Sequence, residues 1–202
     1  MPEGTAKLGE DAIRIARWRA SGVPLRHRRV VEAGMTFESF DEPEAARKVA
    51  AGVKRGGLVL LLGDFGSGKT QLAAWLIWAV CVHGGKLAMY RRFADLLSEM
   101  RQECYTRGGS DAELFARLSR VGLLVLDELH HRRWSEDENL WLLRLLDHRY
   151  GAETPTIAIA NLSRSAAGSA LDGSIIDRLR DGGAVVEMRG PSRRGRAAGV
   201  SS

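Results

Sequence analysis

Residues 57–70 read Gly57-Leu58-Val59-Leu60-Leu61-Leu62-Gly63-Asp64-Phe65-Gly66-Ser67-Gly68-Lys69-Thr70. The apolar run in this stretch is short and bounded by glycines, which favours a β-strand buried on both faces. Residues 71–83 are apolar almost throughout and predict a helix packed against a sheet. A Gly-x-x-x-x-Gly-Lys-Thr loop between a buried strand and a helix is the context that a phosphate-binding loop requires.

The loop carries the strongest chemical signal in the chain. Its glycines let the backbone wrap so that N–H groups point at phosphate oxygens, and the following helix adds its positive end. We expect Lys69 to hold the β- and γ-phosphates of ATP and the Thr70 hydroxyl to bind Mg²⁺. The predicted nucleotide-binding residues are Gly63, Asp64, Phe65, Gly66, Ser67, Gly68, Lys69, Thr70 and Gln71.

A second buried run, residues 121–126, is followed by Asp127 and Glu128. Open α/β sheets bind ligands at the carboxyl ends of their strands, so we expect Asp127 to hold Mg²⁺, mostly through water. Glu128 is placed to orient and activate the attacking water. Acidic residues after a strand also form turns, but their pairing with the loop favours the catalytic interpretation. The pair also favours ATP hydrolysis over a nucleotide kinase, which must keep water away from the γ-phosphate.

Two later residues are weaker candidates. Asn161 follows the apolar run 155–160, where it could either reach the γ-phosphate or the attacking water, or cap the next turn. Arg178 lies in a predicted amphipathic helix, where it is either solvated, paired, or an arginine finger for the ATP of a neighbouring subunit. Beyond them, Arg193 or Arg194 could fold back on the phosphates of its own site.

The predicted elements alternate between strands and helices. Strands are expected at 57–62, 86–90, 121–126, 155–160 and 184–188, and helices near 10–20, 41–54, 71–83, 92–105, 110–118, 135–149 and 174–180. Residues 25–40 are expected to be irregular. This alternation predicts an α/β fold of the three-layer P-loop NTPase type, with a central parallel sheet and helices on both faces.

Charge and composition limit the class of protein. The net charge is +5, but residues 1–30 carry seven Lys or Arg against three acids, and residues 189–202 carry four Arg and no acid. Basic ends suit either solvation or contact with a phosphate backbone or acidic partner. The two cysteines lack metal-ligand spacing. No apolar run approaches the roughly 18 residues of a membrane span, so we expect a cytoplasmic protein without membrane contact.

Taken in order, these motifs resemble those of AAA+ ATPases of the DnaC/IstB group, over roughly residues 20–195. The resemblance rests on the loop 63–70 as Walker A, on Leu126-Asp127-Glu128-Leu129 as Walker B, and on a set of flanking segments. These segments are Ser21-Gly22-Val23-Pro24, Thr36-Phe37-Glu38-Ser39-Phe40, Phe93-Ala94-Asp95-Leu96-Leu97, Asp147-His148-Arg149-Tyr150 and Thr156-Ile157-Ala158-Ile159-Ala160-Asn161-Leu162-Ser163.

The resemblance assigns roles to the weaker candidates. It implies that Asn161 is the sensor-1 residue and that Arg178 is an arginine finger, so the predicted catalytic residues are Glu128, Lys69, Asn161 and Arg178. It also implies that Arg194 is the sensor-2 arginine and contacts the nucleotide. Arg193 stands where the family has an aromatic residue, and it remains an alternative for that role.

The resemblance implies an ATPase that loads a replicative helicase on single-stranded DNA and assembles head to tail when ATP is bound. The alternatives are a transposition helper that binds DNA and a transposase, and a nucleotide-gated DNA-binding module without significant turnover. We expect a basic partner-docking segment at 1–30, the AAA+ domain at 31–190, and a basic, disordered tail at 191–202. Helicase loaders of this family carry a helicase-binding domain before the ATPase, so either the short first segment docks the partner here or the chain is a reduced relative with another partner.

Overall fold

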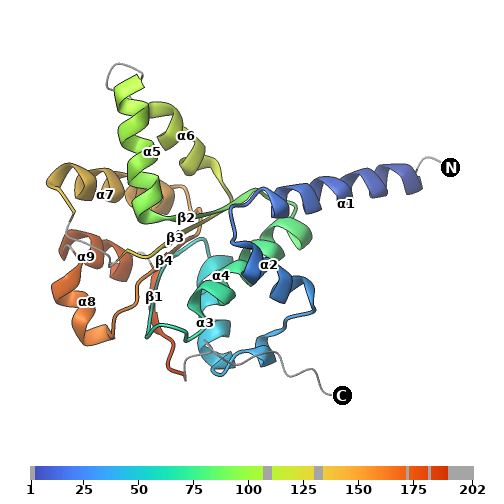
Figure 1. Ribbon diagram of the computed structural model, residues 1–202, viewed down its shortest axis with the longest axis horizontal. Helices are drawn as coiled ribbons and strands as arrows, with labels where there is room; N and C mark the ends of the chain where they lie inside the picture. Colours follow the sequence, from blue (N-terminus) through green and yellow to red (C-terminus); the bar gives the residue numbers. More distant parts are fainter. Residues whose placement is uncertain (1–2, 107–110, 130–133, 172, 182, 191–202) are drawn as a thin grey trace.

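The fold is described from a computed structural model that covers residues 3–106, 111–129, 134–171, 173–181 and 183–190 (Figure 1). Its strands are β1 (Leu58–Leu62), β2 (Ala88–Arg92), β3 (Leu123–Asp127), β4 (Thr156–Ile159) and β5 (Gly183–Glu187). Its helices are α1 (Glu3–Arg19), α2 (Leu25–Glu32), α3 (Pro43–Lys54), α4 (Lys69–Trp78), α5 (Phe93–Thr106), α6 (Ala112–Arg120), α7 (Glu136–Gly151), α8 (Arg164–Ala170) and α9 (Gly173–Asp181). A 3₁₀ turn, η1 (Phe37–Ser39), precedes α3, and a π-helical turn, η2 (Ala79–His83), continues α4.

The five strands form one parallel sheet in the order β2-β3-β4-β1-β5, which confirms the predicted fold class. Every residue of β1, β3 and β4 is buried, whereas β2 and β5 at the edges are partly exposed. The continuous apolar runs in the sequence therefore mark the central strands.

Helices cover both faces of the sheet and form two separate hydrophobic cores (Figure 1). Val59 and Leu61 of β1 face the core that α1–α4 and η2 complete, whereas Leu58, Leu60 and Leu62 face the core of α5–α9. The alternation of side chains along a strand divides one apolar run between the two cores. No helix in the described ranges is long and apolar enough to cross a membrane.

The first part of the chain differs from the expectation. Residues 25–40 were expected to be irregular, but they contain α2 and η1, so that prediction was wrong. α2 packs on α4, and the Trp75 Nε1–H on α4 donates to the Met35 carbonyl at 2.9 Å. Four of the eight residues of α2 are Arg or His, so tertiary contacts rather than apolar periodicity identify this helix. The predicted domain boundary at residue 30 falls inside it.

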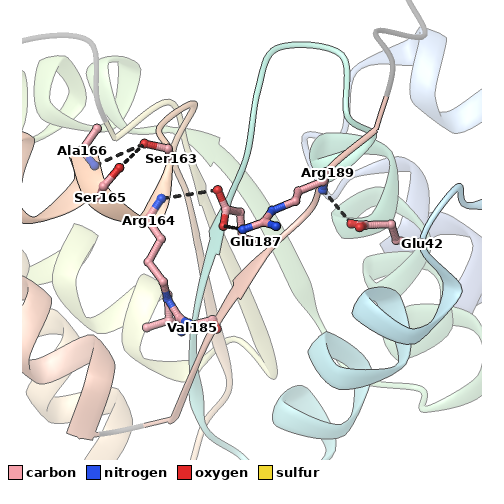
Figure 2. A network of polar contacts seen from close by, with 8 residues as sticks. All are labelled: Glu42, Ser163, Arg164, Ser165, Ala166, Val185, Glu187 and Arg189. Carbon is pink, nitrogen blue, oxygen red and sulfur yellow. Dashed lines mark hydrogen bonds and ion pairs between the residues drawn. The ribbon is translucent and has the colours of Figure 1, made fainter.

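The edge strand β5 is tied to helices on both sides (Figure 2). The Arg164 guanidinium, on α8, donates to the Val185 carbonyl at 3.0 Å, and the Arg189 N–H donates to Glu42 Oε2 beside α3 at 2.6 Å. Glu187 accepts from Arg189 at 3.0 Å, and this contact is the main cause that lowers the pKa of Glu187. These contacts fix the point where the chain leaves the sheet.

Candidate functional site

A cavity of about 730 Å³ lies at the carboxyl ends of β1, β3 and β4. Residues from five separate stretches of the chain form its wall. They are Pro24, Arg26, His27, Val30, Phe65, Gly66, Gly68, Lys69, Thr70, Gln71, Tyr90, Arg92, Asp127, Glu128 and Asn161. The sheet thus brings the loop, Asp127, Glu128 and Asn161 into one site, as their positions after parallel strands led us to expect.

The loop after β1 depends on glycine at two positions. Gly63 has a φ of 135°, and a Cβ there would lie 2.1 Å from the Met188 carbonyl oxygen, so a side chain is excluded by both conformation and space. Gly68 has a φ of 93° and forms the N-cap of α4. The chain can therefore turn sharply from strand to helix and direct the amino end of α4 at the cavity.

The Lys69 ammonium group occupies the centre of the loop. It donates to the carbonyls of Gly63 at 2.8 Å and Asp64 at 2.7 Å, and to Ser67 Oγ at 3.2 Å. Lys69 and Ser67 are both buried. A buried cation at the amino end of a helix forms a strong anion-binding position.

The next helical residue, Thr70, connects the loop to β3. Its hydroxyl donates to Asp127 Oδ2 at 2.9 Å, and the Glu128 N–H donates to Asp127 Oδ1 at 2.7 Å. A hydroxyl and a carboxylate are hard oxygen ligands of the kind that Mg²⁺ accepts when phosphates and water complete its octahedron. The described residues contain no cluster of three His, Cys, Asp or Glu side chains that could hold a metal ion.

Asn161 follows β4, which lies between β1 and β3 in the sheet. It therefore stands between the loop on one side and Asp127 and Glu128 on the other, and it lines the same cavity. Its carboxamide can donate and accept at once, which suits contact with both a phosphate oxygen and a water molecule.

The other side of the cavity was not predicted from the sequence. Pro24, Arg26, His27 and Val30, at the start of α2, form it. His27 Nδ1–H donates to Gln71 Oε1 at 2.8 Å, and Gln71 Nε2 donates to the His27 carbonyl at 3.2 Å. Gln71, which was expected to bind nucleotide, thus lines the cavity. Its two hydrogen bonds to His27 also join α4 to α2. Burial lowers the pKa of His27, although the bond to Gln71 acts in the opposite direction.

Tyr90 and Arg92, on β2, were also missed. The Tyr90 hydroxyl donates to Asp127 Oδ2 at 2.7 Å, and Arg92 pairs in register with Asp127. The sequence shows Tyr90 only as one residue of a short apolar strand. Its role becomes visible once β2 and β3 are known to be neighbours.

Arg178 does not line the cavity of its own chain. It forms an ion pair with Asp147 on α7, and its guanidinium lies 5.7 Å from the centre of the Tyr150 ring. Arg193 and Arg194 lie outside the described residues. The chain leading towards them passes the loop, because the Met188 N–H donates to the Leu62 carbonyl at 2.8 Å and the Met188 carbonyl lies against Gly63.

Known proteins are similar to this chain in sequence and in fold. A family model described as "IstB-like ATP binding protein" matches residues 17–200. The chain is 30% identical over 126 residues to the replicative helicase loader DnaC of Escherichia coli K12, a match that covers 61% of this chain and 50% of that protein. It is 28% identical over 160 residues to DnaC of Buchnera aphidicola from Schizaphis graminum, covering 74% and 65%. The chain thus spans about half the length of the Escherichia coli relative.

Solved structures agree on the fold. The DnaC helicase loader superposes with a TM-score of 0.61 at 20% identity, covering 73% of this chain and 88% of that one. The replication initiator DnaA bound to AMPPCP and single-stranded DNA gives a TM-score of 0.66 at 17% identity, covering 84% and 52%. The parallel sheet and these superpositions show that the chain has the AAA+ fold. Because the family model matches most of the sequence, the chain belongs to the IstB-like ATP-binding family.

Proposed function

We propose that this protein binds ATP with Mg²⁺, hydrolyses the nucleotide, and acts in DNA replication as a DnaC-like loader of a replicative helicase on single-stranded DNA. The observation that carries the proposal is the cavity in which the loop, Asp127, Glu128 and Asn161 face one another. The names of the relatives support replication as the process, since the two relatives compared above are replicative helicase loaders.

Each side chain has a chemical task in this proposal. Lys69 and the amino end of α4 bind the β- and γ-phosphates. Thr70 and Asp127 hold Mg²⁺, which supplies charge neutralisation at the phosphates when bound. Glu128 accepts the proton of the attacking water, and Asn161 orients that water or the γ-phosphate.

Arg178 acts in trans in this proposal. Since it lies on α9 and outside its own cavity, it can reach a nucleotide only in a neighbouring copy of the chain. Its present partner, Asp147, is partly exposed, so the ion pair contributes little and can be exchanged for phosphate contacts. Head-to-tail assembly would therefore complete the site, with Arg194 or Arg193 as a further contact within each subunit.

The partners follow from charge and relatives. α1 extends away from the sheet, and residues 1–30 carry the basic excess described above (Figure 1). α1 itself carries four Lys or Arg against three acids, so three of the four excess positive charges of residues 1–30 come from Arg26, Arg28 and Arg29 on α2. A basic segment of this kind suits either an acidic protein surface or a phosphate backbone. We assign helicase docking to this segment and single-stranded DNA binding to the assembled ATPase domains.

The experiment is a pull-down with the replicative helicase of the same cell, with ATP and single-stranded DNA present or omitted. We expect helicase capture by the wild type and helicase delivery to DNA that requires ATP. Lys69→Ala should lose nucleotide-dependent delivery, whereas Lys86→Ala, at a lysine outside the cavity, should retain it. Absence of helicase capture would overturn the loader proposal, and capture of a transposase in a parallel pull-down would favour a transposition helper.

A further inference from the structure

Tyr90 lies on the edge strand β2, yet it is buried and its backbone is hydrogen-bonded on the outer side of the sheet. It is the third residue of β2, and only 6% of its surface is exposed. Its backbone N–H donates to the Ser21 carbonyl at 2.7 Å, so the chain before α2 closes this edge of the sheet. A Cβ on Gly22 would lie 2.6 Å from the Tyr90 carbonyl oxygen, which shows how closely the two backbones approach. Tyr90 therefore has a fixed backbone from which its ring extends.

The ring brings its hydroxyl to the carboxylate at the centre of the site. Tyr90 donates to Asp127 Oδ2 at 2.7 Å, and Thr70 donates to the same oxygen at 2.9 Å. The Glu128 N–H donates to the other carboxylate oxygen of Asp127, Oδ1, at 2.7 Å. Three donors, from β2, from α4 and from the residue after β3, thus set the orientation of one carboxylate. A carboxylate has enough lone pairs to accept all three and still face a hydrated cation.

The three donors differ in whether their contact with Asp127 would change when Mg²⁺ binds. Thr70 is itself a ligand in the proposed site, so its position depends on the metal. The Glu128 N–H fixes only Oδ1. Tyr90 is the donor to Oδ2 that the metal leaves unchanged.

We propose that Tyr90 is a positioning residue that holds Asp127 in the orientation in which it receives the hydration shell of Mg²⁺. This inference rests on the proposed function, because it assigns Asp127 to the metal. Groups that orient a metal-binding side chain typically change metal affinity by 10- to 100-fold when they are removed. Tyr90→Phe should therefore weaken Mg²⁺ binding and leave the rest of the site intact.

The test measures binding rather than turnover. A fluorescent ATP analogue is titrated onto the full chain at increasing Mg²⁺ and, separately, in EDTA. For Tyr90→Phe we expect the Mg²⁺ concentration for half-maximal binding to rise on the order of 10-fold, with binding in EDTA unchanged. The matched control is Tyr105→Phe, which removes the same hydroxyl at a residue that is 90% exposed and should match the wild type.

A double-mutant cycle shows whether Tyr90 acts through Asp127. In an Asp127→Asn background, Tyr90→Phe should change the Mg²⁺ dependence by less than about twofold, because the carboxylate that it positions is gone. Equal losses in Mg²⁺ and EDTA, or full effects in both backgrounds, would show that Tyr90 only supports the fold and would overturn the inference. Absence of Mg²⁺-dependent binding in the wild type would instead overturn the proposed function and this inference with it.

Discussion

The backbone of Glu128 has a left-handed conformation, with a φ of 65°. A non-glycine residue in such a region costs about 1–3 kcal/mol and persists only where its surroundings enforce it. Here the N–H of Glu128 is held by Asp127 Oδ1, and the residue lines the cavity. The conformation turns the chain sharply after β3 and directs it into the site, so the strain is located where catalysis is proposed.

This placement gives a prediction for the catalytic carboxylate. Glu128→Gln keeps the size and shape of the side chain but removes the base, so ATP turnover should fall at least about 100-fold while ATP binding persists. Phosphate release and fluorescent-nucleotide binding measure the two effects. The control is Glu153→Gln, at an exposed glutamate that also has a positive φ, 49°. Unchanged turnover in Glu128→Gln would contradict the role of Glu128 as the base.

Arg149 is a second residue whose position would be unfavourable without its contacts, because it buries a charged group. Its guanidinium is fully buried, and burial lowers its pKa to about 10. It donates to the carbonyls of Leu118 at 2.6 Å, Val121 at 3.0 Å and Pro155 at 2.6 Å, which lie at the end of α6 and before β3 and β4. Carbonyls at the carboxyl end of a helix attract a cation. Arg149 thus joins one helix to two central strands.

Removing Arg149 should therefore destabilise the whole domain. Arg149→Met leaves several buried carbonyls without a donor, so the free energy of unfolding should fall by about 3–5 kcal/mol. Urea denaturation measures this loss. Arg144→Met, on the exposed side of the same helix and over the Phe115 ring, should cost less than about 1 kcal/mol. Similar losses in the two variants would contradict a special role for Arg149.

At the scale of elements, α2 forms one wall of the proposed nucleotide site. It contributes His27 to the cavity and packs on α4, the helix that begins at the phosphate-binding loop. Trp18 Nε1–H donates to Glu32 Oε1 at 2.8 Å, so α1 and α2 are also joined to each other. A nucleotide that changes the position of α2 would change the direction of α1 as well, which links the site to the proposed docking segment.

The docking of α2 should depend on pH through His27. Burial lowers the pKa of His27 below its ordinary value of 6.5, so the unfolded or undocked chain binds the proton more readily. Stability is then fully present above pH 6.5 and declines as pH falls below it, by at most about 1.4 kcal/mol per pH unit. Urea unfolding of the wild type and of His27→Gln between pH 7.5 and 5.5 tests this. A constant difference between the two proteins would contradict it.

The same elements show what a sequence can and cannot predict. The strands and the large helices were predicted because buried runs and amphipathic patterns are local signals. α2 and α8 were missed, since one is mostly charged and the other is seven residues of mainly small side chains. Lys69, Asp127 and Asn161 follow strands and could be placed in advance. Tyr90 and His27 could not, because their roles depend on which strands and helices become neighbours.

At the scale of the whole molecule, the proposed arginine finger would make the site of a single chain incomplete. The cavity, with Lys69, Asp127 and Glu128, lies at the carboxyl ends of the strands. Arg178 lies elsewhere, on α9, which packs against α7. Closed rings and open spirals both arise when one surface of a subunit meets a different surface of the next. Such an assembly would bring Arg178 of one subunit to the cavity of another.

Mixing two inactive variants tests this arrangement. Lys69→Ala has a defective site but an intact Arg178, and Arg178→Ala has the reverse, so each alone should lose ATP turnover. In an equal mixture, about a quarter of the contacts between subunits would pair an intact site with an intact arginine, and turnover should return to that extent. Asp147→Ala controls for loss of the ion pair, and it should stay active because it removes only the resting partner of Arg178. Full turnover by Arg178→Ala alone at every protein concentration would contradict the finger, because a site that works without this arginine needs none from its neighbour.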